Sequence, residues 1–128
     1  MSQNERRKSP RVRVYDPIAY LSVDSKGKLS HRNVGVVRNV SQTGIRLETF
    51  QAVKSEKIVL MFFDLNKNQI EVEGEVIYCA GNDCGLYDVG INLAGTDGQN
   101  MEFVKALVKS YHYQKKKAHL AISPGLQN

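Results

Sequence analysis

The segment Ile70–Tyr78 alternates apolar and acidic residues, and this pattern constrains the fold more than any other feature. Apolar side chains fall at the even positions, apart from a glycine at 74, and Glu71, Glu73 and Glu75 fall between them. Successive side chains of a β-strand point to opposite faces, so the segment predicts a strand with one face in a core and an acidic face in solvent. By the same count Tyr78 lies on the core face.

Five other segments are rich in β-favouring residues and are bounded by turn residues. They are Val12–Val23, Val34–Val40, Ile45–Glu48, Ile58–Leu65 and Tyr87–Leu93. Pro17 has no N–H to donate, so the first segment is predicted to be an edge strand or to carry a bulge there. The segment 58–65 is apolar on both faces, so both faces are predicted to be covered. Six short strands separated by turns predict a small antiparallel β-barrel.

The hydrophobic period changes after Gly95. Apolar residues then recur at the spacing i, i+3, i+4, namely Met101, Val104, Leu107, Val108 and Tyr111. This spacing predicts an amphipathic helix from about Gly98 to Lys116, with Thr96 or Asp97 as its cap. We therefore expect a mainly β chain in three parts. A flexible basic arm covers residues 1–11, the six-stranded barrel and C-terminal helix cover 12–117, and a loose tail covers 118–128.

Eighteen Lys and Arg against thirteen Asp and Glu give a net charge of +5, which suggests an anionic partner. The longest apolar run, Ile58–Phe63, is far shorter than the roughly 20 residues of a membrane-spanning helix. The first residues are polar and lack the apolar stretch of a signal peptide. The sequence therefore predicts a cytoplasmic protein without a membrane span.

No motif of a common enzyme class is present in the sequence. The chain lacks a G-x-S-x-G nucleophile turn, a P-loop and a G-x-G-x-x-G phosphate loop. Cys79 and Cys84 do not combine with the three histidines at zinc-ligand spacing. We expect two reduced thiols, with a disulfide across the loop as the alternative. The sequence thus predicts no catalytic residue, no metal site and a protein that is not an enzyme.

The N-terminal arm carries a short arginine motif. Arg7 and Arg11 form R-x-x-x-R, Arg6 precedes them, and Pro10 biases Ser9 toward an extended backbone. Guanidinium groups bind phosphates in a bidentate manner, stack on flat rings and donate to the O6 and N7 atoms of guanine. Taken alone, the segment is also typical of a solubilising arm.

A second polar motif follows the second predicted strand. Asn39 and Ser41 lie two residues apart, so we expect them to share an exposed face while Val40 points into the core. Their carboxamide and hydroxyl groups can bond a base edge or a phosphate oxygen. Gly44 permits a positive φ, which allows a sharp turn beneath this pair. The same residues are typical of a hairpin turn that binds no ligand.

The two motifs together, R-x-x-x-R at Arg7–Arg11 and [D/N]-x-S-x-x-G at Asn39–Gly44, resemble the PilZ domain family, which are bacterial receptors for cyclic di-GMP. The segments 45–47, 74–78 and 87–91 are similar to later strands of that family, so the resemblance covers roughly residues 5–115. It implies a PilZ-like split barrel that binds cyclic di-GMP and needs no other cofactor.

The resemblance also implies a role for each motif residue. Arg7 and Arg11 would bind phosphates and guanine faces, with Arg6 as an auxiliary contact. Asn39 and Ser41 would read a guanine or bond a phosphate, and Gly44 would shape the turn.

Two further implications concern single positions. The family often carries an aromatic residue near the end of its fifth strand that stacks on a guanine, and Tyr78 matches that position, although the alternation places it on the core face. The family allows Asp or Asn where this chain has Asn39, and the neutral side chain would lower affinity by ~1 kcal/mol.

The implied function is a receptor that changes conformation when it binds cyclic di-GMP and signals in trans to an unidentified downstream protein. Three alternatives are a single-stranded nucleic-acid-binding barrel, a PilZ-like adaptor that binds protein without nucleotide, and a flavin-binding split barrel. Only 8% of the residues are aromatic and Trp is absent, which disfavours a nucleic-acid surface built on stacking. The sequence leaves the oligomeric state open.

Overall fold

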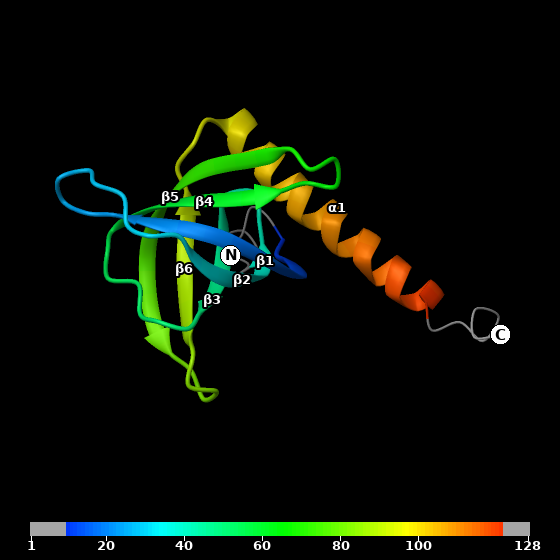
Figure 1. Cartoon of the computed structure of the whole chain (residues 1–128), viewed down its shortest axis with the longest axis horizontal. Coiled ribbons are helices and arrows are strands. Elements are labelled where there is room, and N and C mark those ends of the chain that lie inside the picture. Colours follow the sequence, from blue (N-terminus) through cyan, green and yellow to red (C-terminus); the bar gives the residue numbers. More distant parts are fainter. Residues whose placement is uncertain (1–9, 122–128) are drawn as a thin grey trace, which may run out of the picture.

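Six antiparallel strands close into a barrel, and one long helix follows them (Figure 1). In chain order the elements are β1 (Val12–Val23), β2 (Asn33–Val40), β3 (Gly44–Thr49), β4 (Lys57–Phe63), β5 (Gln69–Gly81), β6 (Tyr87–Leu93) and α1 (Asp97–Ala121). The computed structural model describes residues 10–121, with side chains through residue 118. Around the barrel the strands run β1-β2-β3-β6-β5-β4. The predicted mainly β fold, with its six strands and C-terminal helix, is confirmed.

Alternate residues of the strands fill the barrel, as the period of two requires. Val37 on β2 and Leu47 on β3 have no exposed surface, and the same holds for Leu60 on β4. Helix α1 packs against β1 and β5 and adds Phe103 and Leu107 to this core. Its later turns extend away from the barrel (Figure 1), and the helix side chains from 112 to 118 are exposed.

Helix α1 begins with a reciprocal cap. The backbone N–H of Gln99 donates to Thr96 Oγ1 at 3.1 Å, and the Thr96 N–H donates to Gln99 Oε1 at 2.9 Å. This capping box satisfies two N–H groups of the first turn. The helix runs to Ala121, so the predicted end at Lys116 and a tail starting at residue 118 are too early. The residues from 117 to 121 are mostly good helix formers, and the first proline after the start of the helix is Pro124.

Strand β1 accommodates Pro17 next to a bulge. The pairing of β1 with β2 shifts register between Arg13 and Asp16, just before the proline. Pairing of β1 with β4 begins only at Ala19, so Pro17 lies where β1 has β2 as its neighbour but not β4. The missing N–H of Pro17 therefore interrupts no pairing with β4.

The C-terminal end of β4 is less covered than predicted. Met61 and Phe62 are buried, but Phe63 is 58% exposed and Leu65, beyond the strand, is 47% exposed. The main contacts of the helix are with β1 and β5, and it does not bury these two side chains. The prediction that both faces of this segment are covered is wrong here.

Three further observations concern the cysteines, metal-binding groups and membrane-spanning helices. Cys79 and Cys84 are free thiols, as predicted. Within residues 10–118, no group of three or more His, Cys, Asp or Glu side chains could hold a metal ion. No helix in the described part of the chain has the length and apolar character needed to cross a membrane.

Candidate functional site

A row of paired residues crosses five strands on the outer side of the barrel. Arg13 on β1 pairs with Asn39 on β2, and Asn39 pairs with Arg46 on β3. Arg46 pairs in turn with Gly90 on β6, and Gly90 pairs with Tyr78 on β5. Residues paired across antiparallel strands lie on the same face of the sheet. The register therefore places two arginines, an amide and an aromatic ring side by side.

The two predicted motifs meet at one hydrogen bond. Nη1 of Arg11 donates to Oδ1 of Asn39 at 2.8 Å, across 28 positions of sequence. A guanidinium has five N–H donors, so Arg11 has others available for an anion. Arg6 and Arg7 of the first motif lie outside the described residues. Arg11 is thus the one predicted arginine within the described residues, and it lies beside Asn39.

Ser41 closes the turn after β2 and does not face the pocket beside Asn39. It is 7% exposed, and its hydroxyl accepts the N–H of Gly44 at 3.1 Å and that of Thr43 at 3.4 Å. Because β2 ends at Val40, Ser41 belongs to the turn and does not continue the strand alternation. The expectation that Ser41 and Asn39 share an exposed face is therefore wrong, and the structure gives Ser41 the turn-forming role.

Gly44 is required by close approach and not by backbone conformation. The glycines with positive φ in the described part of the chain are Gly27 and Gly85, so the expected positive φ at Gly44 is wrong. A Cβ atom at Gly44 would stand 2.7 Å from the carbonyl oxygen of Ile91. The absence of a side chain lets the first residue of β3 pair closely with β6.

Tyr78 lies on the outer face, which corrects the face predicted from alternation. Val76 pairs with Ile91 and Tyr78 with Gly90, which leaves Ile77 as an extra residue in β5. Such a bulge reverses the side on which later residues point. Tyr78 is 49% exposed, and its ring lies over Gly90. The run of three apolar residues at 76–78 was the sequence signal of this break in alternation.

Two adjoining pockets open along this row. The larger, of about 710 Å³, is lined by Arg11, Arg13, Val14, Tyr15, Arg38, Asn39, Arg46 and Tyr111. The smaller, of about 340 Å³, is lined by Arg11, Asn39, Ile45, Arg46, Ile77, Tyr78, Gly90, Ile91 and Asn92. Both therefore share Arg11, Asn39 and Arg46. Sequence reasoning missed Arg13, Arg38 and Arg46, because strand alternation places them outside the core but does not give the register that brings them together.

The larger pocket is strongly cationic. Four arginines line it, and no aspartate or glutamate is among its lining residues. Arg38 is held by Glu48, with Nη1 and Oε1 3.0 Å apart, and its guanidinium lies 5.4 Å from the centre of the Tyr15 ring. Clustered like charges repel, and an anion bound among them removes that cost. The pocket is therefore suited to a phosphate-bearing ligand.

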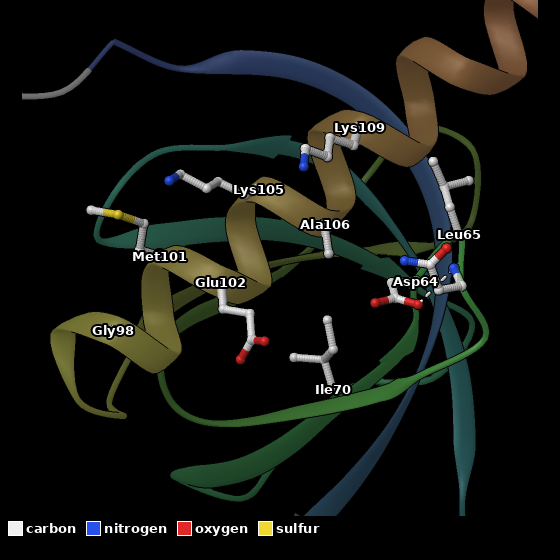
Figure 2. A pocket seen from close by; sticks show the side chains of 10 residues that line it. Asp64, Leu65, Ile70, Gly98, Met101, Glu102, Lys105, Ala106 and Lys109 are labelled. Atoms are coloured by element: carbon white, nitrogen blue, oxygen red, sulfur yellow. Dashed lines mark hydrogen bonds between the residues drawn. The ribbon is translucent and has the colours of Figure 1, made fainter.

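A third pocket, of about 550 Å³, lies between α1 and the β4–β5 turn. Figure 2 shows Glu102 and Asp64 near Ile70 on its lining, and Lys105 and Lys109 also line it. It contains none of the predicted site residues. Its carboxylates oppose an anionic ligand, so the two arginine-lined pockets form the better candidate site.

Asp16 is a buried carboxyl group next to this region. It follows Tyr15, which lines the larger pocket, and has no exposed surface. Neither of its oxygens has a hydrogen-bond partner among the described residues. Removal from water raises the pKa of Asp16 from 3.8 to about 7, because burial disfavours the charged form.

The family comparison covers most of the chain. The model of the PilZ domain matches residues 5–110. No curated protein sequence matches the chain.

Solved structures share the fold at low sequence identity. The PilZ domain of YcgR from Escherichia coli, solved with c-di-GMP, has 9% identity and a TM-score of 0.59, over 88% of this chain and 98% of that one. The inhibitor of motility MotI/DgrA from Bacillus subtilis has 14% identity and a TM-score of 0.56, over 87% and 52%. MrkH from K. pneumonia, solved as a c-di-GMP complex, has 14% identity and a TM-score of 0.53, over 84% and 55%. The chain thus spans about half the length of MotI/DgrA and of MrkH.

Proposed function

The chain belongs to the PilZ domain family, and from this premise we propose that it is a receptor for cyclic di-GMP. The observation that carries the proposal is the hydrogen bond from Arg11 to Asn39, which joins the two family motifs at the point that both pockets share. Two of the similar structures, YcgR and MrkH, were solved with c-di-GMP.

The chemistry of the two pockets supports this ligand. Cyclic di-GMP has two negative phosphates and two flat purines, so it needs cations and stacking surfaces at the same time. Arg11 and Arg13 supply cations that can form bidentate bonds with phosphate oxygens. The half-exposed ring of Tyr78 supplies a stacking surface in the smaller pocket. Stacking of a base on an aromatic side chain contributes about 1–3 kcal/mol.

The remaining motif residues have complementary roles in this proposal. Arg6 and Arg7, from the arm over residues 1–11, bind phosphates and guanine faces. Asn39 presents its amide to a guanine edge while it holds Arg11. Ser41 and Gly44 act indirectly by fixing the turn that follows Asn39. A dissociation constant near 1 μM, about −8 kcal/mol, suits a messenger that is sensed reversibly.

We propose that helix α1 carries the signal to a separate protein, so that the chain acts as a receptor and not as an enzyme. Tyr111 of α1 lines the larger pocket, so a ligand there contacts the helix directly. The same helix extends beyond the barrel with exposed side chains from 112 to 118 (Figure 1). A ligand that binds more tightly to one position of the helix increases the population of that position. The size of this shift is set by the difference in affinity between the two positions.

Calorimetric titration of the whole chain with three ligands tests the proposed receptor. Cyclic di-GMP is expected to bind in the micromolar range, whereas GTP, which lacks the second guanine, binds far more weakly. A short single-stranded oligonucleotide is expected to show no comparable affinity at physiological salt. Tight oligonucleotide binding that falls steeply with salt, without binding of cyclic di-GMP, would instead identify a nucleic-acid module.

A further inference from the structure

Arg46 lies at the junction of the two pockets. Its neighbours Ile45 and Leu47 are buried in the barrel, so the strand alternation directs Arg46 to the outer face. It pairs with Asn39 on one side and with Gly90 on the other, and it lines both pockets. Arg46 therefore lies between Asn39, which accepts a hydrogen bond from Arg11, and Gly90, which lies under the ring of Tyr78.

The charge of Arg46 has no protein partner in the described part of the chain. Its Nε atom is buried and makes no hydrogen bond. Arg38 and Arg11, by contrast, donate to Glu48 and to Asn39. A buried N–H without an acceptor destabilises the fold, and the cost is larger when the group is charged. Such a group in a folded protein calls for an acceptor that the described residues do not supply.

The surroundings define the chemistry of that acceptor. Neither pocket has an aspartate or glutamate in its lining, so no carboxylate there neutralises Arg46 and an anionic ligand can do so. A guanidinium presents Nε–H and Nη–H in a fixed fork that fits two oxygens of one phosphate, whereas a lysine provides only a point charge. Arg46 lines both pockets. It therefore suits a ligand whose anionic phosphate lies between two halves that each carry a base.

Resting on the receptor function proposed above, we propose that Arg46 is a ligand-binding residue outside the two family motifs. Its guanidinium donates to a phosphodiester of cyclic di-GMP and places the two halves of the ligand in the two pockets. Arg46 thereby favours a dinucleotide over a mononucleotide, because a mononucleotide with its phosphate at Arg46 fills only one pocket.

The test compares the whole chain with its Arg46→Met, Arg46→Lys and Arg32→Met variants. Arg32 is exposed and lines a different, mostly apolar pocket beside Pro17 and Phe63. Arg32→Met is therefore the matched control, because it also removes one arginine. Calorimetry with cyclic di-GMP is expected to show about 10- to 100-fold weaker binding for Arg46→Met, the loss of one or two charge-assisted hydrogen bonds. Arg46→Lys recovers part of this loss, and Arg32→Met binds like the wild type.

A second readout separates ligand binding from a structural role. Without ligand, Arg46→Met is expected to keep or raise the melting temperature, because it removes an unpaired buried donor and a like charge among arginines. The weaker binding should also depend less on salt, since one charge contact is gone. A lower melting temperature with proportionally lower affinity would make Arg46 structural and overturn the inference. Should Arg46→Met not fold, Arg46→Lys decides by the same two readouts.

The outcomes distinguish this inference from the function on which it rests. Wild-type binding with unchanged affinity in Arg46→Met overturns the role of Arg46 and leaves the receptor function intact. A folded wild type that does not bind cyclic di-GMP overturns both.

Discussion

The ring of Tyr78 on β5 covers Gly90 on β6, so that a Cβ atom at Gly90 would stand 2.6 Å from the Cδ2 atom of the ring. The two residues pair directly across the strands, next to the extra residue Ile77. The absence of a side chain at Gly90 therefore allows the ring to lie close to β6, where it lines the smaller pocket. We regard this pair as the stacking platform of the proposed site.

Replacing Gly90 by alanine should weaken ligand binding more than folding. The added Cβ displaces the half-exposed Tyr78 ring, which can move outward at modest cost to stability. We expect cyclic di-GMP affinity to fall about tenfold, part of the stacking contribution, with a small change in melting temperature. Gly81→Ala, at the end of β5, is the control, because a Cβ there meets nothing within 4 Å. Equal affinity in the two variants contradicts the platform role.

Replacing Ser41 by alanine should destabilise the fold. The Gly44 and Thr43 N–H groups lose the buried Ser41 hydroxyl that accepts them. We expect the free energy of unfolding in urea to fall by about 1–2 kcal/mol. Thr43→Ala, at an exposed side chain of the same turn, serves as the control. No loss of stability in Ser41→Ala, together with a large loss of affinity, would argue for direct ligand contact by Ser41.

The buried Asp16 should make stability depend on pH. Its pKa is raised to about 7 in the fold by burial, against 3.8 ordinarily, so between these values the native state holds a proton that the unfolded chain has lost. The contribution of this proton to the stability of the native state is full below pH 4, falls as the pH rises, and is lost above pH 7. At roughly 1.4 kcal/mol per pH unit, it amounts to about 4 kcal/mol.

Asp16→Asn is neutral at every pH and isolates this contribution. We expect the free energy of unfolding of the variant, minus that of the wild type, to rise by several kcal/mol between pH 4 and pH 8. Urea denaturation at pH 4, 6 and 8 measures this difference. If the difference stays constant with pH, Asp16 is not a buried group of raised pKa.

Replacing Asn39 by aspartate should strengthen ligand binding. A carboxylate forms a charge-assisted bond with Arg11 and accepts guanine N–H groups more strongly than an amide oxygen does. We expect a gain of ~1 kcal/mol, or about fivefold in affinity, by calorimetry. Asn92→Asp, at another lining residue of the smaller pocket, tests whether any added carboxylate has this effect. An equal gain in both variants, or weaker binding in Asn39→Asp, contradicts the assigned role of Asn39.

The fold followed from the sequence because hydrophobic periodicity encodes it. The alternation in Ile70–Tyr78 and the i, i+3, i+4 spacing after Gly95 predicted strand and helix, and the capping box at Thr96 marks the helix start. The side on which Tyr78 lies did not follow, because one extra residue at Ile77 reverses the alternation.

The site was predicted in part. The motifs identified Arg11 and Asn39, which the structure brings into contact. Arg13 and Arg46 could not be predicted, because their proximity to Asn39 depends on the exact register between neighbouring strands, which bulges shift. The role of Gly44 also depends on a neighbouring strand, since its missing side chain admits the Ile91 carbonyl.

The central claim is that the two motifs act together on one ligand, and calorimetric titration of cyclic di-GMP into the wild type, Arg11→Ala and Arg32→Ala tests it most directly. The account predicts micromolar binding by the wild type and by Arg32→Ala, and at least tenfold weaker binding by Arg11→Ala at an unchanged melting temperature. Binding of the same strength in Arg11→Ala, or no binding by the folded wild type, would contradict it.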